Sequence, residues 1–484
     1  MSSLKGFFKD TIIYGIAAVL PRAINILLTR LHTEKLDTDK FAENTWYFVF
    51  AAYFIGFLTF GLETAFFRFF TKEKEKGKVV STAFVTLIST VGLFLLVLLA
   101  FNNQIAAWLG FNDPLHLKIL TLVTAFDTFV VIPFAYLRVM NKPIKFTLFK
   151  TANILIYAFF NLFFLWFIPY AIANQIELPA FLIKHYQSTP TVVYIFIANL
   201  IASVSTFLLL LPSMLRFKLV FDRALLKKML AYGVPIMIGT LAYITNENLD
   251  KLLLRDVIGD SQMGIYAACY KLGVFMTLYV MAFRLGAEPF FFNEASKENA
   301  KQTYATIMKW FTVIGALFML IVVGFIDIPA SLLLAQGEYF EALAIVPIIL
   351  LANLFLGIYH NLSVWYKLTD RTKFGMYFSI VGALITIGLN VLLIEKYGYM
   401  ASAWATLAAY GFMCLISYFY GKKYYQVPYR VDRILLYLLL AAVLSFLSFY
   451  QYKNNYLVSS LFILGFLTVI LLGERKELKT ILKK

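Results

Sequence analysis

The sequence is poor in charge and poorer still in histidine and cysteine. Of its 484 residues, 14% are charged, four are histidine and two are cysteine. Both cysteines, Cys269 and Cys414, lie inside apolar segments, so we expect small apolar side chains rather than a disulfide or a metal site. The sequence contains no glycine-rich P-loop followed by Lys-Ser or Lys-Thr, which argues against ATP hydrolysis. We expect no bound cofactor.

Apolar side chains dominate what is present. The chain is 61% hydrophobic and 18% aromatic, which is more than a soluble core can bury, so lipid must be part of the solvent. Polar stretches are short and recur between apolar runs of about 20 residues, the pattern of repeated membrane spans. The net charge of +16 comes from Lys and Arg beside the ends of these runs, which favours the positive-inside rule and argues against a nucleic-acid partner.

The apolar runs predict about 14 transmembrane helices. They begin near residues 10, 44, 80, 118, 148, 190, 229, 263, 304, 342, 374, 400, 433 and 456. The first run lacks a small-residue cleavage site, so we expect a retained helix rather than a signal peptide. An even number of spans places both termini on one side, and roughly 32 of the 43 Lys and Arg belong to that side, which predicts cytoplasmic termini. The outward loops, at most roughly 20 residues long, leave no room for an external catalytic domain.

Two similar segments indicate an internal repeat. The second predicted helix ends with GLETAFF at residues 61–67, and the eighth ends with GAEPFFF at residues 286–292, each before a polar loop. Six spans separate the repeats, so both have the same orientation, and two such bundles can enclose a central cleft that opens to either face. This organisation predicts a transporter that works by alternating access. The predicted parts are an N-terminal six-helix bundle (1–228), a C-terminal six-helix bundle (229–432), and two further helices with a basic tail (433–484).

Several short motifs in the second half carry a family resemblance. They are YGVP at residues 232–235, NLDKLLL at 248–254, GIY at 264–266 and EPFF at 288–291. Their order and spacing resemble those of bacterial polysaccharide-unit (O-antigen) flippases in the multidrug/oligosaccharidyl-lipid/polysaccharide (MOP) exporter superfamily. Lys251 stands where an arginine is common in these relatives, which keeps the charge but loses the bidentate fork.

The resemblance implies a fold and a substrate. The fold is an all-α, MATE-like polytopic membrane protein with two bundles around a cleft. The substrate is an undecaprenyl-pyrophosphate-linked oligosaccharide, flipped across the bacterial inner membrane for lipopolysaccharide or another polysaccharide, with a polysaccharide polymerase as a possible partner. A cation-coupled multidrug exporter and a lipid II flippase are alternatives on the same fold. A membrane glycosyltransferase is disfavoured because the outward loops are short.

Ionisable residues inside predicted spans are the candidate substrate contacts, because a charge at bilayer depth costs about 2.5–3.5 kcal/mol even on lenient insertion scales. Arg22 follows Pro21 midway along the first helix, and Asn25 and Thr29 extend a polar stripe at helical spacing. Lys271 lies too deep in the eighth helix to reach an interface easily. We expect these cations to grip the pyrophosphate or acidic sugars, with Lys251 and Arg255 as further candidates.

Acidic residues are the candidates for coupling to H⁺ or Na⁺. Asp127 is central in the fourth helix, with no opposite charge in that helix, and Glu247 and Asp250 lie near the outward end of the seventh helix. The alternative interpretation of Asp127 is a neutral aspartate that hydrogen-bonds to a neighbouring helix. The alternative interpretation of Glu247 and Asp250 is a solvated rim at the helix end.

A third group is predicted to brace the inward gate or to anchor helices at the interface. It comprises Glu63, Arg284 and Glu288, with Arg284 and Glu288 spaced to form a pair. Among the histidines, we expect His32, His116 and His185 to be exposed, at or beyond outward helix ends.

Overall fold

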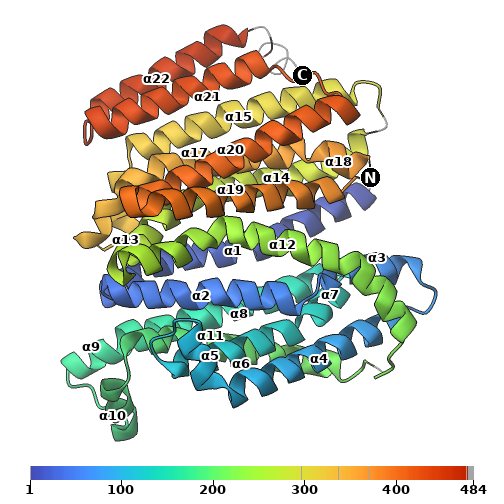
Figure 1. Cartoon of the computed structure of the whole chain (residues 1–484), viewed down its shortest axis with the longest axis vertical. Helices are drawn as coiled ribbons and strands as arrows, with labels where there is room; N and C mark the ends of the chain where they lie inside the picture. Colours follow the sequence, from blue (N-terminus) through green and yellow to red (C-terminus); the bar gives the residue numbers. More distant parts are fainter. Residues whose placement is uncertain are drawn as a thin grey trace. The chain divides into compact units, whose positions relative to one another are not determined.

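The computed structural model describes residues 2–217, 219–295, 297–335, 337–369, 371–475 and 477. For residues 2–18, 285, 286, 288, 289, 292 and 293, only the backbone is described. The described residues form helices joined by short loops, with no β-strand among them (Figure 1). The predicted all-α polytopic class is confirmed.

The chain divides into two compact units, residues Met1–Arg255 and Asp256–Lys484. The helices of the N-terminal unit are α1 (Ser2–Lys35), α2 (Thr38–Leu58), α3 (Leu62–Lys72), α4 (Lys76–Ala100), α5 (Asn102–Trp108), α6 (Pro114–Phe129), α7 (Val131–Val139), α8 (Pro143–Leu162), the π-helical turn η1 (Phe163–Phe167), α9 (Ile168–Ala173), α10 (Ala180–Ser188), α11 (Thr191–Met214) and α12 (Arg223–Ile258). The last turn of α12 crosses the boundary between the units. The predicted boundaries at residues 228/229 and 432/433 mark the ends of sequence repeats, whereas the observed boundary separates compact units. The predicted boundaries therefore stay a prediction.

The C-terminal unit continues the same pattern. Its helices are α13 (Asp260–Tyr270), the 3₁₀ turn η2 (Lys271–Gly273), α14 (Val274–Glu294), α15 (Ala300–Gly324), α16 (Asp327–Leu333), η3 (Glu338–Ile345), α17 (Val346–Leu362), α18 (Val364–Leu368), α19 (Lys373–Tyr397), α20 (Tyr399–Tyr424), α21 (Val431–Phe446), η4 (Leu447–Gln451) and α22 (Tyr456–Gly473).

The spans agree with the predicted apolar runs. Among the described residues, 13 helices are long and apolar enough to cross a membrane, several of them built from two of the labelled helices. Helix α1, with 34 residues, supplies the fourteenth segment of the predicted set. Predicted and observed starts differ by only a few residues after α1. Each apolar run forms a helix because a spanning segment in lipid must satisfy its own backbone hydrogen-bonding groups.

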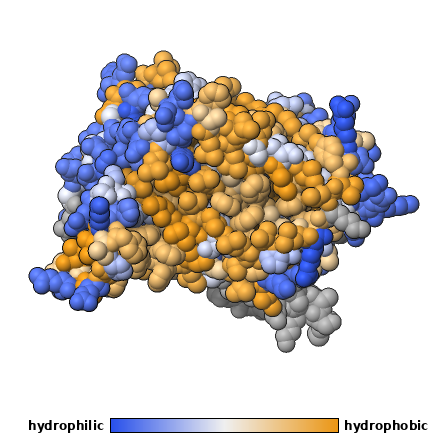
Figure 2. Space-filling view, turned by 90° about the horizontal axis from the view of Figure 1, so that it is seen from below, coloured by the Kyte–Doolittle hydropathy of each residue, from blue (hydrophilic) through white to orange (hydrophobic). Residues whose placement is uncertain are grey.

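The surface fits a lipid environment. The face shown in Figure 2 carries a broad apolar field, with polar side chains gathered at its two ends. On α4, Leu93 and Leu96 are each 65% exposed. Exposure of these side chains is unfavourable in water but not against lipid acyl chains.

A break in the second span separates α2 from α3. Phe60 and Gly61 have positive φ angles of 48° and 65°. A Cβ on Gly61 would lie 2.2 Å from the carbonyl oxygen of Gly233 on α12, so the two backbones meet here with no room for a side chain. The close approach fixes where α3 leaves the line of α2.

Loops define two ends of the N-terminal unit. The Leu36 end holds the α1–α2, α5–α6 and α9–α11 connections, and the Lys74 end holds the α3–α4, α7–α8 and α11–α12 connections. These names are used below to give direction along the helices.

Candidate functional site

The two cations predicted inside spans occupy different settings. Arg22 lies midway along α1, directly after Pro21, and its side chain is exposed. Asn25 is exposed too, whereas Thr29 is buried and its hydroxyl donates to the Asn25 carbonyl at 3.0 Å. The predicted polar stripe therefore ends at Asn25.

Lys271 begins the 3₁₀ turn η2, which interrupts the span made by α13 and α14. Its side chain is half-buried. The Asn353 side chain donates to the Gly273 carbonyl at 3.1 Å and so satisfies one backbone acceptor beside the break. A helix interrupted in mid-span is a common way to present polar groups at membrane depth.

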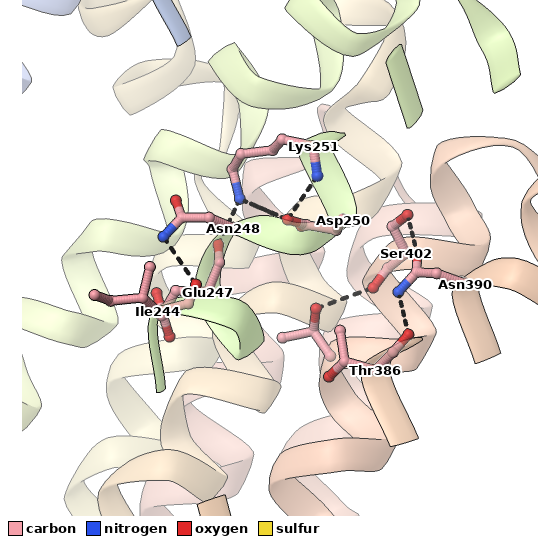
Figure 3. A network of polar contacts seen from close by, with 9 residues as sticks. Ile244, Glu247, Asn248, Asp250, Lys251, Thr386, Asn390 and Ser402 are labelled. Carbon is pink, nitrogen blue, oxygen red and sulfur yellow. Dashed lines mark hydrogen bonds and ion pairs between the residues drawn. The ribbon is translucent and has the colours of Figure 1, made fainter. Parts of the chain in front are cut away.

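Lys251 and Asp250 form a buried ion pair near the end of α12 (Figure 3). The Lys251 ammonium lies 3.0 Å from Asp250 Oδ1 and donates to the Glu247 carbonyl oxygen at 2.7 Å. The structure thus brings three of the predicted residues together. The ammonium bonds to the Glu247 backbone in addition to the neighbouring carboxylate.

Arg255 is held by the α5–α6 loop. Its guanidinium donates to the Gly110 carbonyl at 2.6 Å and to Asn112 Oδ1 at 3.0 Å, and it stacks over Trp46 at 4.2 Å. The planar fork suits this arrangement, and it secures the end of α12 at the Leu36 end of the N-terminal unit.

Asp127 lies on α6 inside the N-terminal unit, half-buried rather than lipid-facing. Ser203 on α11 and Lys150 on α8 lie near enough to influence its carboxylate electrostatically, and the Lys150 ammonium stands over the Phe134 ring, 4.4 Å from its centroid. Sequence reasoning missed Lys150, because the counter-charge comes from the next span rather than from the same helix.

Glu63 forms an ion pair with Arg138 on α7, at 3.2 Å, at the Lys74 end. Both side chains are about half exposed, so the pair itself contributes little stability. Lys150 is also attracted to Glu63 and repelled by Arg138. Of Asp127, Lys150, Glu63 and Arg138, the last two alone form an ion pair within 4 Å in the described part of the chain.

Arg284 lies on α14, with its Nη1 3.4 Å from Nε2 of His360 on α17. The predicted partner, Glu288, has a side chain outside the described residues, so the pairing stays a prediction.

A buried cluster that sequence reasoning missed joins α15 to the chain after α22. The Lys309 ammonium, 2% exposed, pairs with the carboxylates of Glu474 and Glu477. Tyr437 donates to Glu474 at 3.1 Å, and Trp310 donates to Glu477 at 2.7 Å. Partial burial alone would raise the pKa of the Glu477 carboxyl, but the hydrogen bonds from Lys309 and Trp310 lower that pKa below its ordinary value.

A second missed cluster pairs α19 with α20 and is also drawn in Figure 3. The Ser402 hydroxyl donates to Asn390 Oδ1 at 2.6 Å, and the Asn390 amide donates to the Thr386 carbonyl at 2.7 Å. All three are fully buried. Single polar residues of this kind do not stand out in a sequence.

The expectation of exposed histidines at outward helix ends was wrong for two of them. His32 and His116 are each 4% exposed. The reason is that α1 continues to Lys35 and α6 begins at Pro114, so both rings lie within packed helices. The His32 ring hydrogen-bonds to Asn161 at 2.8 Å, and His116 stacks edge-on against Phe196. Both cysteines are free and buried, as predicted.

A family model described as polysaccharide biosynthesis protein matches residues 3–287, more than half of the chain. The chain belongs to this family. A second model, MatE, matches residues 235–392. The family places the chain among the membrane flippases and transporters of the MOP superfamily, which confirms the resemblance found in the sequence.

The chain is similar in sequence to two proteins from other organisms. The flippase-family chain is 20% identical over 317 residues to the Lsg locus putative protein 1 of Haemophilus influenzae, covering 63% of this chain and 70% of that protein. It is 25% identical over 182 residues to an uncharacterized membrane protein of Methanocaldococcus jannaschii, covering 37% and 42% of the two chains.

Solved structures show the same fold. The lipid II flippase MurJ, in an inward closed conformation, is similar with a TM-score of 0.68 and 15% identity, over 97% of this chain and 100% of that one. An inward-facing MATE family multidrug resistance transporter is similar with a TM-score of 0.66 and 11% identity, over 88% and 99%. At these identities the likeness concerns the fold alone.

Proposed function

We propose that this protein flips an undecaprenyl-pyrophosphate-linked oligosaccharide, a polysaccharide repeat unit, from the cytoplasmic to the outer leaflet of a bacterial inner membrane. The observation that carries the proposal is the match of residues 3–287 to the polysaccharide biosynthesis family. Alternating access suits the task, because the headgroup crosses in a polar cavity while the polyprenyl tail stays in lipid. In this proposal both termini are cytoplasmic.

Arg22 and Lys271 are the proposed headgroup contacts. One lies in each unit, both lie within membrane spans, and both stand beside a helix irregularity, a proline or a 3₁₀ turn. A guanidinium binds a phosphate through two parallel hydrogen bonds, and an ammonium adds a point charge. Lys251 is a further proposed contact. We assign Arg255 to positioning α12, because its guanidinium already binds Gly110, Asn112 and Trp46.

The test is transbilayer movement of a fluorescent undecaprenyl-pyrophosphate-linked oligosaccharide in liposomes that contain the purified protein. We expect the Arg22→Ala/Lys271→Ala double variant to flip at least about tenfold more slowly, since two charge-assisted contacts are lost. Lys396→Ala/Lys453→Ala removes two exposed cations and serves as the matched control. Equal flipping by the two double variants would overturn the site assignment, and no flipping by the wild-type protein would overturn the function.

A cation-coupled exporter of amphipathic drugs is the second candidate, favoured by the MatE match over residues 235–392. It predicts that expression raises drug resistance and that acidic residues such as Asp127 and Glu247 dominate the effect. A lipid II flippase is the third, and a lipid II analogue in the same liposome assay separates it from the first. In the leading proposal, the driving force is an ion gradient, and a polysaccharide polymerase consumes the flipped product. The proposed protein catalyses no reaction on the glycan. New glycosidic bonds formed by the purified protein would contradict the proposal.

A further inference from the structure

The turn between α7 and α8, at the Lys74 end of the N-terminal unit, gathers positive charge. The cations between residues 138 and 150 are Arg138, Lys142, Lys145 and Lys150. The sequence has no aspartate or glutamate from residue 128 to residue 176. The chain around the turn therefore supplies no neighbouring carboxylate to balance these charges.

The α3–α4 loop at the same end is built differently. Residues 72–76 alternate lysine and glutamate, and Lys78 forms an ion pair with Glu75 at 2.7 Å. Such alternation is typical of a solvated polar connection. A general excess of positive charge at this end therefore does not account for the α7–α8 turn, in which acidic residues are absent.

The turn has a well-defined backbone. Asn141 adopts a left-handed conformation with a φ of 51°. The Lys142 N–H donates to the Leu137 carbonyl at 2.9 Å, which closes the end of α7. Pro143 then begins α8, a position that suits proline. Lys142 and Lys145 are both exposed, so they project from a fixed turn.

Arg138 fastens this turn to the neighbouring helix. Its guanidinium carbon lies 4.7 Å from the ring centroid of Phe67 on α3 and 6.0 Å from that of Phe146 on α8. It also pairs with Glu63 on α3. Helices α3 and α7 lie next to each other (Figure 1). Arg138 is therefore engaged within the protein and positions the turn.

Lys142 and Lys145 are not engaged in this way. Neither lysine forms an ion pair within 4 Å in the described part of the chain. Long lysine side chains at the end of a span extend along apolar surface and place their ammonium groups at the level of the lipid headgroups. The two lysines are therefore free to bind a phosphate there.

An exposed apolar stripe on α8 begins beside these lysines. Ile144 is 63% exposed, Leu148 60%, Leu155 53% and Phe159 61%. Their spacing of four, seven and four residues places them on one face of the helix, and α8 also packs against α1 and α11. The helix thus offers cations at the end of the span and an apolar track along it.

We propose that the α7–α8 turn is a binding site for an anionic phospholipid. Lys142 and Lys145 bind its phosphate, and the α8 stripe from Ile144 to Phe159 lies along an acyl chain. In the proposed orientation this lipid belongs to the cytoplasmic leaflet. The site goes beyond the proposed function and does not depend on which molecule the protein moves.

The chemistry of the site favours an anionic lipid over other occupants. A zwitterionic headgroup carries its own cation, which the two lysines repel. A free phosphate ion would use the lysines and leave the apolar stripe without a partner. A phospholipid with a net negative charge matches both parts of the site.

The first test measures lipid binding to the full-length protein in detergent. Native mass spectrometry follows titration with phosphatidylglycerol or with phosphatidylcholine of the same acyl chains. The wild type should bind phosphatidylglycerol at least about tenfold more tightly, and Lys142→Gln/Lys145→Gln should remove this preference, because each lysine near an anionic lipid contributes about fivefold. Lys142→Arg/Lys145→Arg keeps both charges and should keep the preference.

The matched control is Lys72→Gln/Lys74→Gln, which removes the same charge from exposed positions at the same end. It should bind phosphatidylglycerol as the wild type does. Equal losses in the two glutamine variants, or no lipid preference in the wild type, would overturn the site. Undecaprenyl pyrophosphate that binds more tightly than phosphatidylglycerol, and is lost in Lys142→Gln/Lys145→Gln, would reassign the turn to the transported lipid. Failure of the flipping assay would leave these outcomes unchanged.

The second test locates the acyl chain. Leu148→Cys carries a bimane label in phosphatidylcholine vesicles that contain a small fraction of phosphatidylglycerol or phosphatidylcholine with a nitroxide on the acyl chain. Quenching by the phosphatidylglycerol should be at least about twofold stronger, because the site enriches anionic lipid. Leu93→Cys on α4, a position 65% exposed, is the control and should be quenched equally by both lipids. Equal quenching at residue 148 would overturn the site.

Discussion

In the C-terminal unit, the Lys309 ammonium is enclosed by Glu474 and Glu477, and Tyr437 and Trp310 complete the hydrogen bonds of those carboxylates. In the N-terminal unit, the Lys150 ammonium stands over the Phe134 ring, 4.4 Å from its centroid, and forms no ion pair within 4 Å among the described residues, whereas Glu63 is paired with Arg138. A buried charge with a complete set of partners is held in one arrangement, whereas a cation without a close carboxylate partner is held less firmly. The cluster around Lys309 therefore fastens α15 to the chain after α22, whereas Lys150 fastens no helix through an ion pair among the described residues.

The largest expected effect comes from removing the cation of the buried cluster formed by Lys309, Glu474 and Glu477. Lys309→Met leaves the buried Glu474 carboxylate without its cation, which should lower the free energy of unfolding by about 3–5 kcal/mol. Chemical or thermal unfolding in detergent measures the loss. The Lys309→Met/Glu474→Gln double variant should regain much of it, because no uncompensated charge is then buried. A single variant as stable as the wild type would show that the cluster fastens nothing.

The next effect tests the close backbone approach beside Glu63, where the α2–α3 break meets α12. Gly61→Ala places a Cβ against the Gly233 carbonyl and forces alanine into a positive φ, so the free energy of unfolding should fall by about 1–3 kcal/mol. Gly92→Ala on α4 is the matched control, because no atom lies within 4 Å of its added Cβ. Equal stability of the two variants would mean that the α2–α12 crossing is loose.

The same substitution at Lys150 in the N-terminal unit compares the two lysines directly. Lys150→Met should cost only about 1–2 kcal/mol of unfolding free energy. Asp127 can take up a proton and become neutral, and Glu63 keeps Arg138. Measured beside Lys309→Met under the same conditions, a loss as large as that of Lys309→Met would show that Lys150 is held as firmly as Lys309.

The smallest effect is a pH dependence of the fastened cluster. The pKa of Glu477 is lowered in the folded protein, so its contribution is present above the unfolded pKa and is lost as pH falls through the folded pKa. We expect the wild type to lose less than about 1 kcal/mol more than Glu477→Gln on acidification, since the side chain is partly exposed. Unfolding midpoints measured at neutral and acidic pH give the difference; parallel pH profiles would show that Glu477 is not held by Lys309.

The sequence predicted the helices well because their signal is local. An apolar run of span length and the loops beside it are visible within about 20 residues. The depth of Arg22, Lys271 and Asp127 follows from the same count. Ion pairs between helices were not visible: Lys309 is 165 positions from Glu474, and this pairing leaves no trace in one sequence. The burial of His116 was missed for the related reason that helix boundaries were set a few residues short.

Native mass spectrometry of the lipids that co-purify with the protein is the decisive measurement for the proposed substrate and its contacts. We expect a bound species with the mass of undecaprenyl pyrophosphate plus a short oligosaccharide, depleted in the Arg22→Ala/Lys271→Ala variant and retained in Lys396→Ala/Lys453→Ala. Phospholipids alone, or the same glycolipid in equal amount in both variants, would contradict it.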